Sequence, residues 1–370
     1  MFRRALILAA TRDGAQVTAV GAGGDGYDKK LEAEGIFFRD APISFRSRSP
    51  FVDLTLVISL TRYFRATQTD VCHAFTIKPA IFATLSAALA RVPVRVVTIT
   101  GLGFAFTSAG GLLRRVVETL YRLALHYAHV VYFQNAEDRD LFITRKLVSA
   151  EKTRLVAGSG VDIRRFQPAA LPSSAGQAPT FLMIGRLLRD KGIVEFQTAA
   201  TLLRARFPAA RCLLLGGEDP RNPSKLDAAE IAALRGTPGL IVLEECDDVR
   251  PVIAGADVLV LPSYREGLPR SLLEGAAMGR ALIATDVPGC RDVVEHNKNG
   301  LLVARADAAS LADAMLRLTK EPQLIATFGA AARKLVEDRF DEQKVIDNTL
   351  ATYRKLLASN SRNAKSTASH

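Results

Sequence analysis

Residues 258–286 constrain the fold of this 370-residue sequence more than any other stretch. The stretch opens with a continuous apolar run, 258–261, which predicts a buried parallel strand. A polar loop follows over 264–268, and apolar residues then recur at helical spacing after Pro269, which suits the first position of a helix. A second apolar run, 281–284, predicts the next strand. This order of strand, loop, helix and strand predicts an open α/β sheet that binds a ligand at the carboxyl end of the first strand.

Two carboxylates mark this unit, Glu266 in the loop and Glu274 in the helix. Eight positions of continuous helix span about 12 Å, whereas a retaining glycosidase holds its carboxyl pair about 5–5.5 Å apart, so a hydrolase is a poor interpretation. Between the two acids, free amides at the helix N-terminus suit an anion. The residues expected there are Gly267, Leu268, Pro269 and Ser271. Two carboxylates that can accept hydrogen bonds from ligand hydroxyls, with an anion site between them, predict a sugar nucleotide as the ligand. Either glutamate alone would be more typical of an exposed surface charge.

Neighbouring strand ends supply cations and glycines. The apolar run 180–184 is followed by Gly185, Arg186 and, five residues later, Lys191. The run 212–215 ends at Gly216 in the same way. Positive charge at this edge of a sheet would stabilise a diphosphate as it leaves a sugar.

The sequence from Glu266 to Glu274 resembles the E-x7-E motif of family-4 retaining glycosyltransferases. Further runs agree with this family, at residues 185–192, 216–217, 288–292 and 299–303. The N-terminal half is similar, more loosely, to the members that extend a sugar on a polyisoprenyl diphosphate in bacterial polysaccharide and glycoprotein pathways. The resemblance implies an α/β protein with the GT-B fold, in which two Rossmann-like doubly wound parallel-sheet domains face a cleft.

The resemblance also implies a reaction. A hexose or N-acetylhexosamine would leave a UDP-sugar, such as UDP-N-acetylgalactosamine or UDP-galactose, for a sugar on undecaprenyl diphosphate. Glu274 would accept from the ribose hydroxyls, and Glu266 would hold the donor sugar. Arg186 and Lys191 would stabilise the departing UDP, so that no protein nucleophile, cofactor or metal is required. The sequence leaves the donor sugar, the acceptor sugar and the linkage open, because pocket shape decides them.

The length suits two domains. The expected boundaries are an acceptor-binding domain over 1–165, a nucleotide-sugar-binding domain over 166–340, a crossover helix over 341–357 and a disordered tail over 358–370. Within the first domain, the resemblance makes residues 5–10 a helix and residues 15–20 the family's second strand. The customary first strand and its glycine-bearing loop are therefore expected to be missing, which motivates a catalytically silent sugar-nucleotide-binding protein as an alternative.

Positive charge is concentrated in the first domain. Residues 1–165 hold 23 Lys and Arg against 14 Asp and Glu, a balance of +9 within the total of +11. Such a surface attracts anionic lipid or diphosphate, and without interleaved aromatic residues it is not typical of nucleic-acid binding. The expected location is cytoplasmic, peripheral on the inner face of the cell membrane, with the amphipathic helix over 112–127 as one candidate contact.

Four further positions are candidates on the acceptor side. Arg46 and Arg48, in a basic loop, suit a diphosphate or lipid headgroup because guanidinium groups match phosphate geometry. His73 is placed by the sequence at a strand-to-helix junction, where α/β folds gather ligand groups. The next predicted strand is followed by Thr100, at a point where relatives often carry a histidine, and then by Gly101. The alternatives are a solvated loop and a structural histidine.

A second function class comes from a G-x-G-x-x-G pattern formed by Gly21, Gly23 and Gly26, with Asp40 nineteen positions after the first glycine. This pattern is the fingerprint of dinucleotide binding when a long helix follows it. It therefore predicts an NAD-dependent oxidoreductase as an alternative. The following helix is expected to have barely two turns, which favours a glycine-rich surface turn instead.

Overall fold

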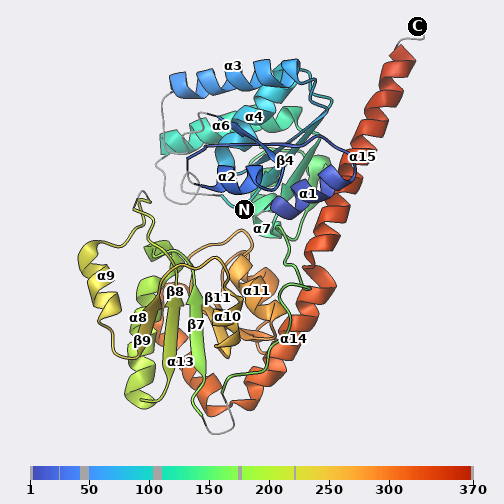
Figure 1. The fold of residues 1–370 in the computed structure, drawn as a ribbon. Helices are drawn as coiled ribbons and strands as arrows, with labels where there is room; N and C mark the ends of the chain where they lie inside the picture. Colours follow the sequence, from blue (N-terminus) through green and yellow to red (C-terminus); the bar gives the residue numbers. More distant parts are fainter. Residues whose placement is uncertain are drawn as a thin grey trace. The chain divides into compact units, whose positions relative to one another are not determined.

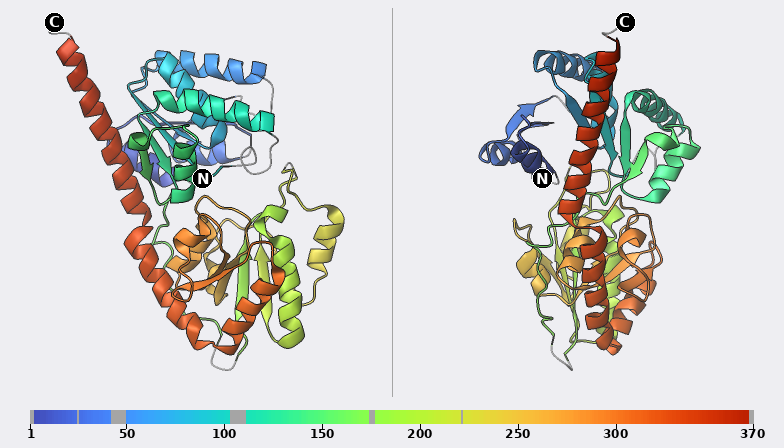
Figure 2. Two further views of the ribbon diagram at one scale, coloured as in Figure 1. Left: turned by 180° about the vertical axis from the view of Figure 1, so that it is seen from behind. Right: turned by 90° about the vertical axis from the view of Figure 1, so that its right-hand side faces the viewer.

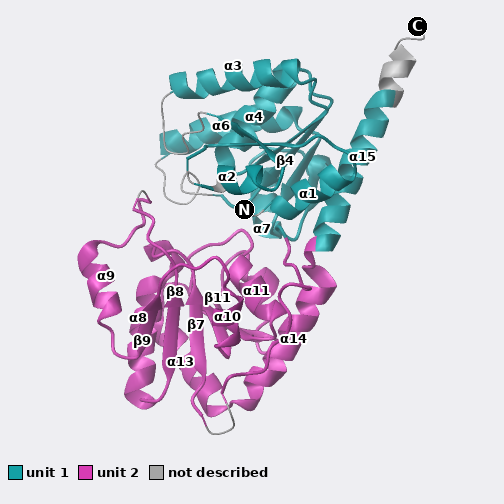
Figure 3. Cartoon of the chain, in the orientation of Figure 1, with its two compact units in different colours: residues 1–159, 343–370 teal, residues 160–342 magenta. Residues whose placement is uncertain are grey.

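The computed structural model describes residues 3–24, 26–41, 50–102, 111–173, 177–220 and 222–367. These residues form two compact units (Figure 3). Unit 1 comprises residues 1–159 and 343–370, and unit 2 comprises residues 160–342. The chain thus enters unit 2 at Gly160 and returns to unit 1 after Glu342.

Unit 2 is built on a sheet of six parallel strands (Figure 1). In sheet order these are β12 (Gly300–Val303), β11 (Ala281–Thr285), β10 (Val258–Leu261), β7 (Thr180–Ile184), β8 (Arg211–Leu215) and β9 (Leu240–Leu243). Every residue of β10 and β11 is buried, because helices cover both faces of a parallel sheet. This explains why these strands are continuous apolar runs rather than alternating ones.

The helices of unit 2 follow the strands in alternation. They are α8 (Ile193–Arg206), α9 (Ala228–Arg235), α10 (Arg250–Ala254), α11 (Arg270–Ala277), α12 (Cys290–Val293), α13 (Ala308–Lys320) and α14 (Gln323–Arg339). The largest core cluster joins the central strands to α8 and α13, with Phe181, Phe196 and Met315 fully buried. The core therefore fixes β7 and β10, whose carboxyl ends carry the candidate site.

Unit 1 contains two separate parallel sheets (Figure 2). One pairs β1 (Thr18–Gly21) with β2 (Phe37–Asp40). The other has the order β3 (Val71–Phe75), β4 (Val94–Ile99), β5 (Val130–Phe133) and β6 (Thr153–Leu155). The sequence predicts one doubly wound domain here, whereas in the structure its strands form two separate sheets.

The helices of unit 1 are α1 (Arg4–Arg12), α2 (Tyr27–Glu32), α3 (Pro50–Ala66), α4 (Ile77–Leu89), α6 (Gly111–Tyr127), α7 (Ala136–Thr144) and α15 (Glu342–Thr367). The last helix packs against the four-stranded sheet (Figure 2). Tyr132 donates to Thr352 at 2.7 Å, and Asn360 donates to the carbonyl of Pro93 at 2.6 Å. The C-terminal helix therefore belongs to unit 1, which also contains the N-terminus.

The structure differs from the sequence-based expectations at three helices. α11 begins at Arg270, so Pro269 is the residue that precedes the helix and not its first position. α15 continues to Thr367, where the polar composition predicted disorder from residue 358. α9 was not predicted, although Asp227 and Glu230 form the capping box that marks its start. By contrast, the residue 5–10 segment lies within α1, a helix as expected.

None of the helices in the described part of the chain is long and apolar enough to cross a bilayer.

Candidate functional site

The candidate site lies at the carboxyl ends of β7 and β10 in unit 2. Glu266, Gly267 and Leu268 occupy the loop that leaves β10, and α11 follows. A Cβ atom on Gly289 would lie 2.6 Å from the carbonyl oxygen of Gly267, so only glycine allows the backbone at 289 to approach this loop. The loop conformation is thus fixed by close backbone packing.

Glu266 is paired with a cation from the neighbouring strand end. The Lys191 Nζ lies 2.5 Å from Glu266 Oε1, and the two side chains are 23% and 12% exposed. Lys191 comes from the short 3-10 helix η2 (Arg189–Lys191) that follows β7. Two candidates that are 75 residues apart in the sequence are therefore in direct contact.

Backbone contacts hold η2 against the β10 loop. The amide of Tyr264 and the hydroxyl of Ser263 both donate to the carbonyl of Asp190, at 2.9 and 3.2 Å. Gly192 has φ +78°, and a Cβ atom there would lie 2.1 Å from the carbonyl oxygen of Pro262. The position next to Lys191 therefore requires glycine both for its backbone conformation and for space.

Glu274 lies on α11 with only 9% of its surface exposed. Its Oε1 accepts from Arg270 Nε at 2.7 Å, one helical turn earlier. Burial raises the pKa of the Glu274 carboxyl, while Arg270 lowers it. A largely buried carboxylate in the field of Arg270 and Arg165 is suited to accept hydroxyl hydrogens from a bound ligand.

The side chain of the residue before α11 does not cap the helix N-terminus. The preceding residue, Pro269, makes no side-chain hydrogen bond to the helix, and Ser271 is its second residue. The first amides of a helix lack partners within the helix, and the helix dipole favours an anion beside them. The loop and the first turn of α11 can therefore bind a phosphate between Glu266 and Glu274.

Gly185 and Gly216 bring the ends of β7 and β8 together. A Cβ atom on Gly216 would lie 1.9 Å from the Gly185 carbonyl oxygen, which forbids any side chain there. Arg186 follows immediately, and its guanidinium donates to Asp219 Oδ2 at 2.7 Å. Its side chain is 57% exposed, so it remains open to a ligand at this edge of the sheet.

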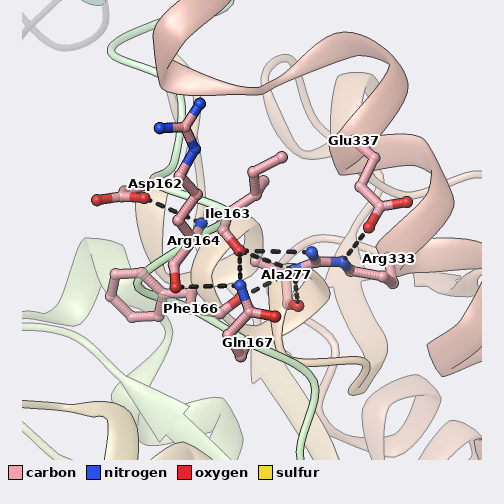
Figure 4. A network of polar contacts seen from close by, with 8 residues as sticks. All are labelled: Asp162, Ile163, Arg164, Phe166, Gln167, Ala277, Arg333 and Glu337. Carbon is pink, nitrogen blue, oxygen red and sulfur yellow. Dashed lines mark hydrogen bonds and ion pairs between the residues drawn. The ribbon is translucent and has the colours of Figure 1, made fainter.

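Arg333 on α14 anchors the other end of α11 (Figure 4). Its Nη1 donates to the carbonyl of Ala277 at 2.6 Å and to the carbonyl of Phe166 at 2.8 Å, while Nε pairs with Glu337 at 2.6 Å. A cation at the C-terminal end of a helix satisfies carbonyls that lack partners within the helix. The helix that bears Glu274 is thus fixed at its last turn by the segment through which the chain enters unit 2.

In unit 1, the structure places His73 in the middle of β3 rather than at its junction with α4. Its two ring nitrogens contact the Tyr353 hydroxyl and Thr98 Oγ1, the latter at 2.7 Å. Burial lowers the pKa of His73 well below its usual value, and the charge of Arg3 adds to this effect. Both ring nitrogens have hydrogen-bond partners within unit 1, which is typical of a structural histidine.

The remaining candidates of unit 1 are Gly101, Arg46 and Arg48. Gly101 follows β4, as the sequence predicts. Arg46 and Arg48 lie outside the described residues.

In the glycine-rich turn after β1, backbone amides donate hydrogen bonds to nearby carboxylates of the same unit. The amide of Gly23 donates to Asp40 Oδ1, and the amide of Gly24 donates to Asp28 Oδ2, both at 2.9 Å. The next helix, α2, has six residues. Carboxylates occupy the amides that a pyrophosphate would need, so the geometry is that of a surface turn and does not fit a dinucleotide.

The segment on the other side of the 185–191 turn was not predicted from the sequence. Residues 217–220 and 222–230, here named the strap, run beside this turn and contribute Asp219. A pocket of about 550 Å³ adjoins the strap, and Leu187, Leu226 and Ile231 are among the residues that line it. The turn-forming Pro220 and Pro223 and the capping box were the sequence signals that marked this segment.

Two family profiles match this chain. The profile described as "Glycosyl transferase 4-like domain" matches residues 3–158, and the profile described as "Glycosyl transferases group 1" matches residues 178–321. The first match lies in unit 1 and the second lies in unit 2.

Similar curated proteins come from bacterial glycan pathways. One is the N,N'-diacetylbacillosaminyl-diphospho-undecaprenol alpha-1,3-N-acetylgalactosaminyltransferase of Campylobacter jejuni, which is 27% identical over 90% of this chain and 89% of that protein. Another is the UDP-Gal:alpha-D-GlcNAc-diphosphoundecaprenol alpha-1,3-galactosyltransferase of Escherichia coli, which is 25% identical over 84% of this chain and 82% of that protein.

Solved structures share the fold of the whole chain. Sucrose-phosphate synthase from Thermosynechococcus elongatus is 22% identical, with a TM-score of 0.79 over 97% of this chain and 93% of its own. HepE from Anabaena, in complex with UDP, is 18% identical, with a TM-score of 0.77 over 96% of each chain.

Proposed function

Because this chain belongs to the group 1 glycosyl transferases and has the GT-B fold, we propose that it moves a hexose or N-acetylhexosamine from a UDP-sugar onto a sugar carried by undecaprenyl diphosphate. The Campylobacter and Escherichia relatives, whose names describe that acceptor type, support the proposal over most of their lengths. Their donor sugars favour UDP-N-acetylgalactosamine or UDP-galactose here, with retention of anomeric configuration.

The observation that carries the proposal is the pairing of Lys191 with Glu266 beside the α11 N-terminus. A diphosphate at this N-terminus would draw the ammonium of Lys191 toward its oxygens and leave the Glu266 carboxylate to the hydroxyls of the donor sugar. Glu274, one turn into α11, would accept from the ribose hydroxyls. Two carboxylates on either side of a diphosphate site would together suit a nucleoside diphosphate sugar.

Catalysis in this proposal is electrostatic. As the bond between the anomeric carbon and the UDP oxygen breaks, negative charge grows on the leaving diphosphate. Backbone contacts hold the segments that carry Lys191 and Gly267 in place before the reaction, so Lys191, Arg186 and the amides near Gly267 would stabilise that charge with little movement of the backbone. Glu266 orients the sugar, and such positioning lowers the barrier further.

A test of this function uses purified protein, bacterial membranes and a panel of radiolabelled UDP- and GDP-sugars. The proposal predicts that label from a UDP-hexose or UDP-N-acetylhexosamine enters the lipid fraction. Incorporation only from GDP-sugars would overturn the donor assignment. UDP binding without transfer from any sugar would favour the silent sugar-nucleotide-binding protein, and binding of NADH in place of UDP would favour the oxidoreductase.

The acceptor's lipid implies contact with an anionic membrane surface, and we assign that contact to α6. Its exposed apolar side chains recur on one face, with Leu112 78%, Val116 49%, Leu123 49% and Tyr127 42% exposed. Arg115 and Arg122 flank this stripe. An exposed apolar stripe beside arginines is typical of helices that lie on anionic bilayers.

Vesicle sedimentation tests this assignment. We expect the protein to bind vesicles that contain phosphatidylglycerol more tightly than vesicles of phosphatidylcholine, and the double change Leu112→Ser and Leu123→Ser to weaken that binding. The control is Val194→Ser with Leu202→Ser, two exposed apolar residues of α8 in unit 2. Equal binding by the two double variants would contradict the assignment.

A further inference from the structure

The strap is hydrogen-bonded along the turn that carries the proposed phosphate ligands. The amide of Leu187 donates to the carbonyl of Gly217 at 3.0 Å, and the amide of Arg189 donates to the carbonyl of Ser224 at 2.8 Å. The amide of Asp190 donates to the Ser224 hydroxyl at 3.0 Å. The 185–191 turn is therefore bonded to the strap on one side and to the β10 loop on the other.

The strap is itself held in shape by local bonds. Asn222 Oδ1 accepts from the amide of Ser224 at 3.0 Å, and the amide of Asn222 donates to the carbonyl of Asp219 at 2.9 Å. Leu226 is 5% exposed, and Asp227 begins α9 with a capping box. The backbone that carries Asp219 is thus well supported.

The side chain of Asp219 is more confined by its surroundings than the side chain of Arg186. The Asp219 side chain is 20% exposed, and its Oδ2 accepts from Asn222 Nδ2 at 3.4 Å as well as from Arg186 Nη1 at 2.7 Å. The Arg186 side chain is 57% exposed. A long, exposed arginine samples many rotamers, and this freedom must be lost when it binds a ligand.

We propose that Asp219 is a positioning residue, which holds the Arg186 guanidinium at the end of β7 so that its remaining N–H groups meet the diphosphate of the nucleotide sugar. The proposal rests on the proposed function, since it concerns the same donor site. One guanidinium nitrogen bonds Asp219, and the fork geometry leaves other donors for phosphate oxygens. Arg186 would then bind the diphosphate from a conformation that it already has.

The sign of the effect distinguishes this role from simple charge neutralisation. An acid beside a phosphate site repels the anion, so its removal by itself would tighten nucleotide binding. If Asp219 instead positions Arg186, its removal frees the arginine side chain and weakens binding. The change Asp219→Asn keeps the shape of the side chain and removes its charge, so the direction of the change in UDP affinity decides between the two roles.

The experiment measures UDP and uridine affinity by calorimetry for the full chain. We expect Asp219→Asn to weaken UDP binding about two- to tenfold, the range expected for one side chain that must be ordered on binding, and to leave uridine binding unchanged because uridine has no phosphate. The sugar-transfer assay should show the loss in KM for the UDP-sugar more than in kcat. In an Arg186→Gln background, Asp219→Asn should have no further effect.

The matched control is Glu218→Gln, which removes the same charge one residue earlier. Glu218 lies 3.9 Å from Arg235 and not beside Arg186, so UDP affinity should be maintained. Unchanged or tighter UDP binding by Asp219→Asn, or equal losses for UDP and uridine, would overturn the positioning role alone. A wild-type protein that does not prefer UDP to uridine would overturn the proposed function with it.

Discussion

The two units are both parallel α/β structures, yet their strand ends differ in what the glycines do. In unit 2, added Cβ atoms on Gly192, Gly216 and Gly289 would lie between 1.9 and 2.6 Å from a carbonyl oxygen of a neighbouring segment. In the turn after β1 of unit 1, Gly24 and Gly26 have left-handed backbones, but added Cβ atoms would find nothing within 4 Å. Glycine therefore fixes adjacent segments against one another in unit 2 and only shapes a turn in unit 1.

The charged groups follow the same division. Both units contain a half-buried lysine that pairs with a carboxylate, Lys191 with Glu266 at 2.5 Å and Lys78 with Asp53 at 2.8 Å. The first pair lies beside the N-terminus of α11, and the second joins α4 to α3. The pair in unit 2 thus lies among groups that suit an anion, whereas the pair in unit 1 connects two helices.

The largest predicted effect concerns Glu266. We expect Glu266→Gln to lower kcat by about 10²–10³-fold, the usual loss when one oriented polar contact to the reacting group is removed, with little change in UDP affinity. Steady-state kinetics with a UDP-sugar and UDP calorimetry measure the two quantities. A loss of UDP affinity as large as the loss of kcat would place Glu266 on the nucleotide and not on the sugar.

The glycine comparison predicts a smaller, structural effect. Gly192→Ala introduces both left-handed strain and a clash with the Pro262 carbonyl, so we expect about 2–4 kcal/mol of destabilisation. The control, Gly24→Ala, has a similar φ of +88° without the clash, so about 1–2 kcal/mol is expected. Thermal unfolding of both variants measures the difference, and equal losses would contradict the distinction between the units.

The two lysines are expected to differ in their effect on UDP binding. We expect Lys191→Met to weaken UDP binding about 10–100-fold, as is usual for one charge-assisted hydrogen bond. Lys78→Met should leave UDP binding unchanged while lowering the thermal stability, because it leaves the Asp53 carboxylate unpaired in unit 1. An equal loss of UDP affinity in both variants would show that the Lys191 effect is indirect.

The smallest effects are changes of stability with pH, and they have opposite signs in the two units. The lowered pKa of His73 means that folding favours its neutral form, so its contribution to stability is lost as pH falls below 6.5. The raised pKa of Glu274 means that folding favours its protonated form, so its ionisation lowers stability as pH rises above 4.5. Midpoints of thermal unfolding from pH 4 to 8, compared with His73→Gln and Glu274→Gln, check both signs. Differences that do not vary with pH would contradict them.

The sequence predicted unit 2 well because its strands are buried on both faces. The runs predicted at 180–184 and 258–261 are strands with those bounds, and the runs at 212–215 and 281–284 lie within β8 and β11. Continuous apolar runs of this length are typical of strands that are buried on both faces of a parallel sheet. The contact of Lys191 with Glu266 could not be derived from spacing, since the two lie 75 residues apart and meet through the strand order β10, β7.

Unit 1 was harder to predict because its polar residues are engaged within the unit. The position of His73 beside a predicted helix suggested a ligand, but its partners Tyr353 and Thr98 come from α15 and β4. A contact across 280 residues leaves no local signal in the sequence. The separation of β1 and β2 into their own sheet is likewise a property of strand pairing and not of any one segment.

Hydrogen exchange with and without UDP tests most directly whether unit 2 binds a nucleoside diphosphate where η2 and the β10 loop meet. We expect UDP to slow exchange of the amides over 185–192 and 266–272, while the amides over 18–41 exchange at an unchanged rate. Unchanged exchange over 185–192 and 266–272 at a UDP concentration that saturates binding would exclude a nucleotide site there.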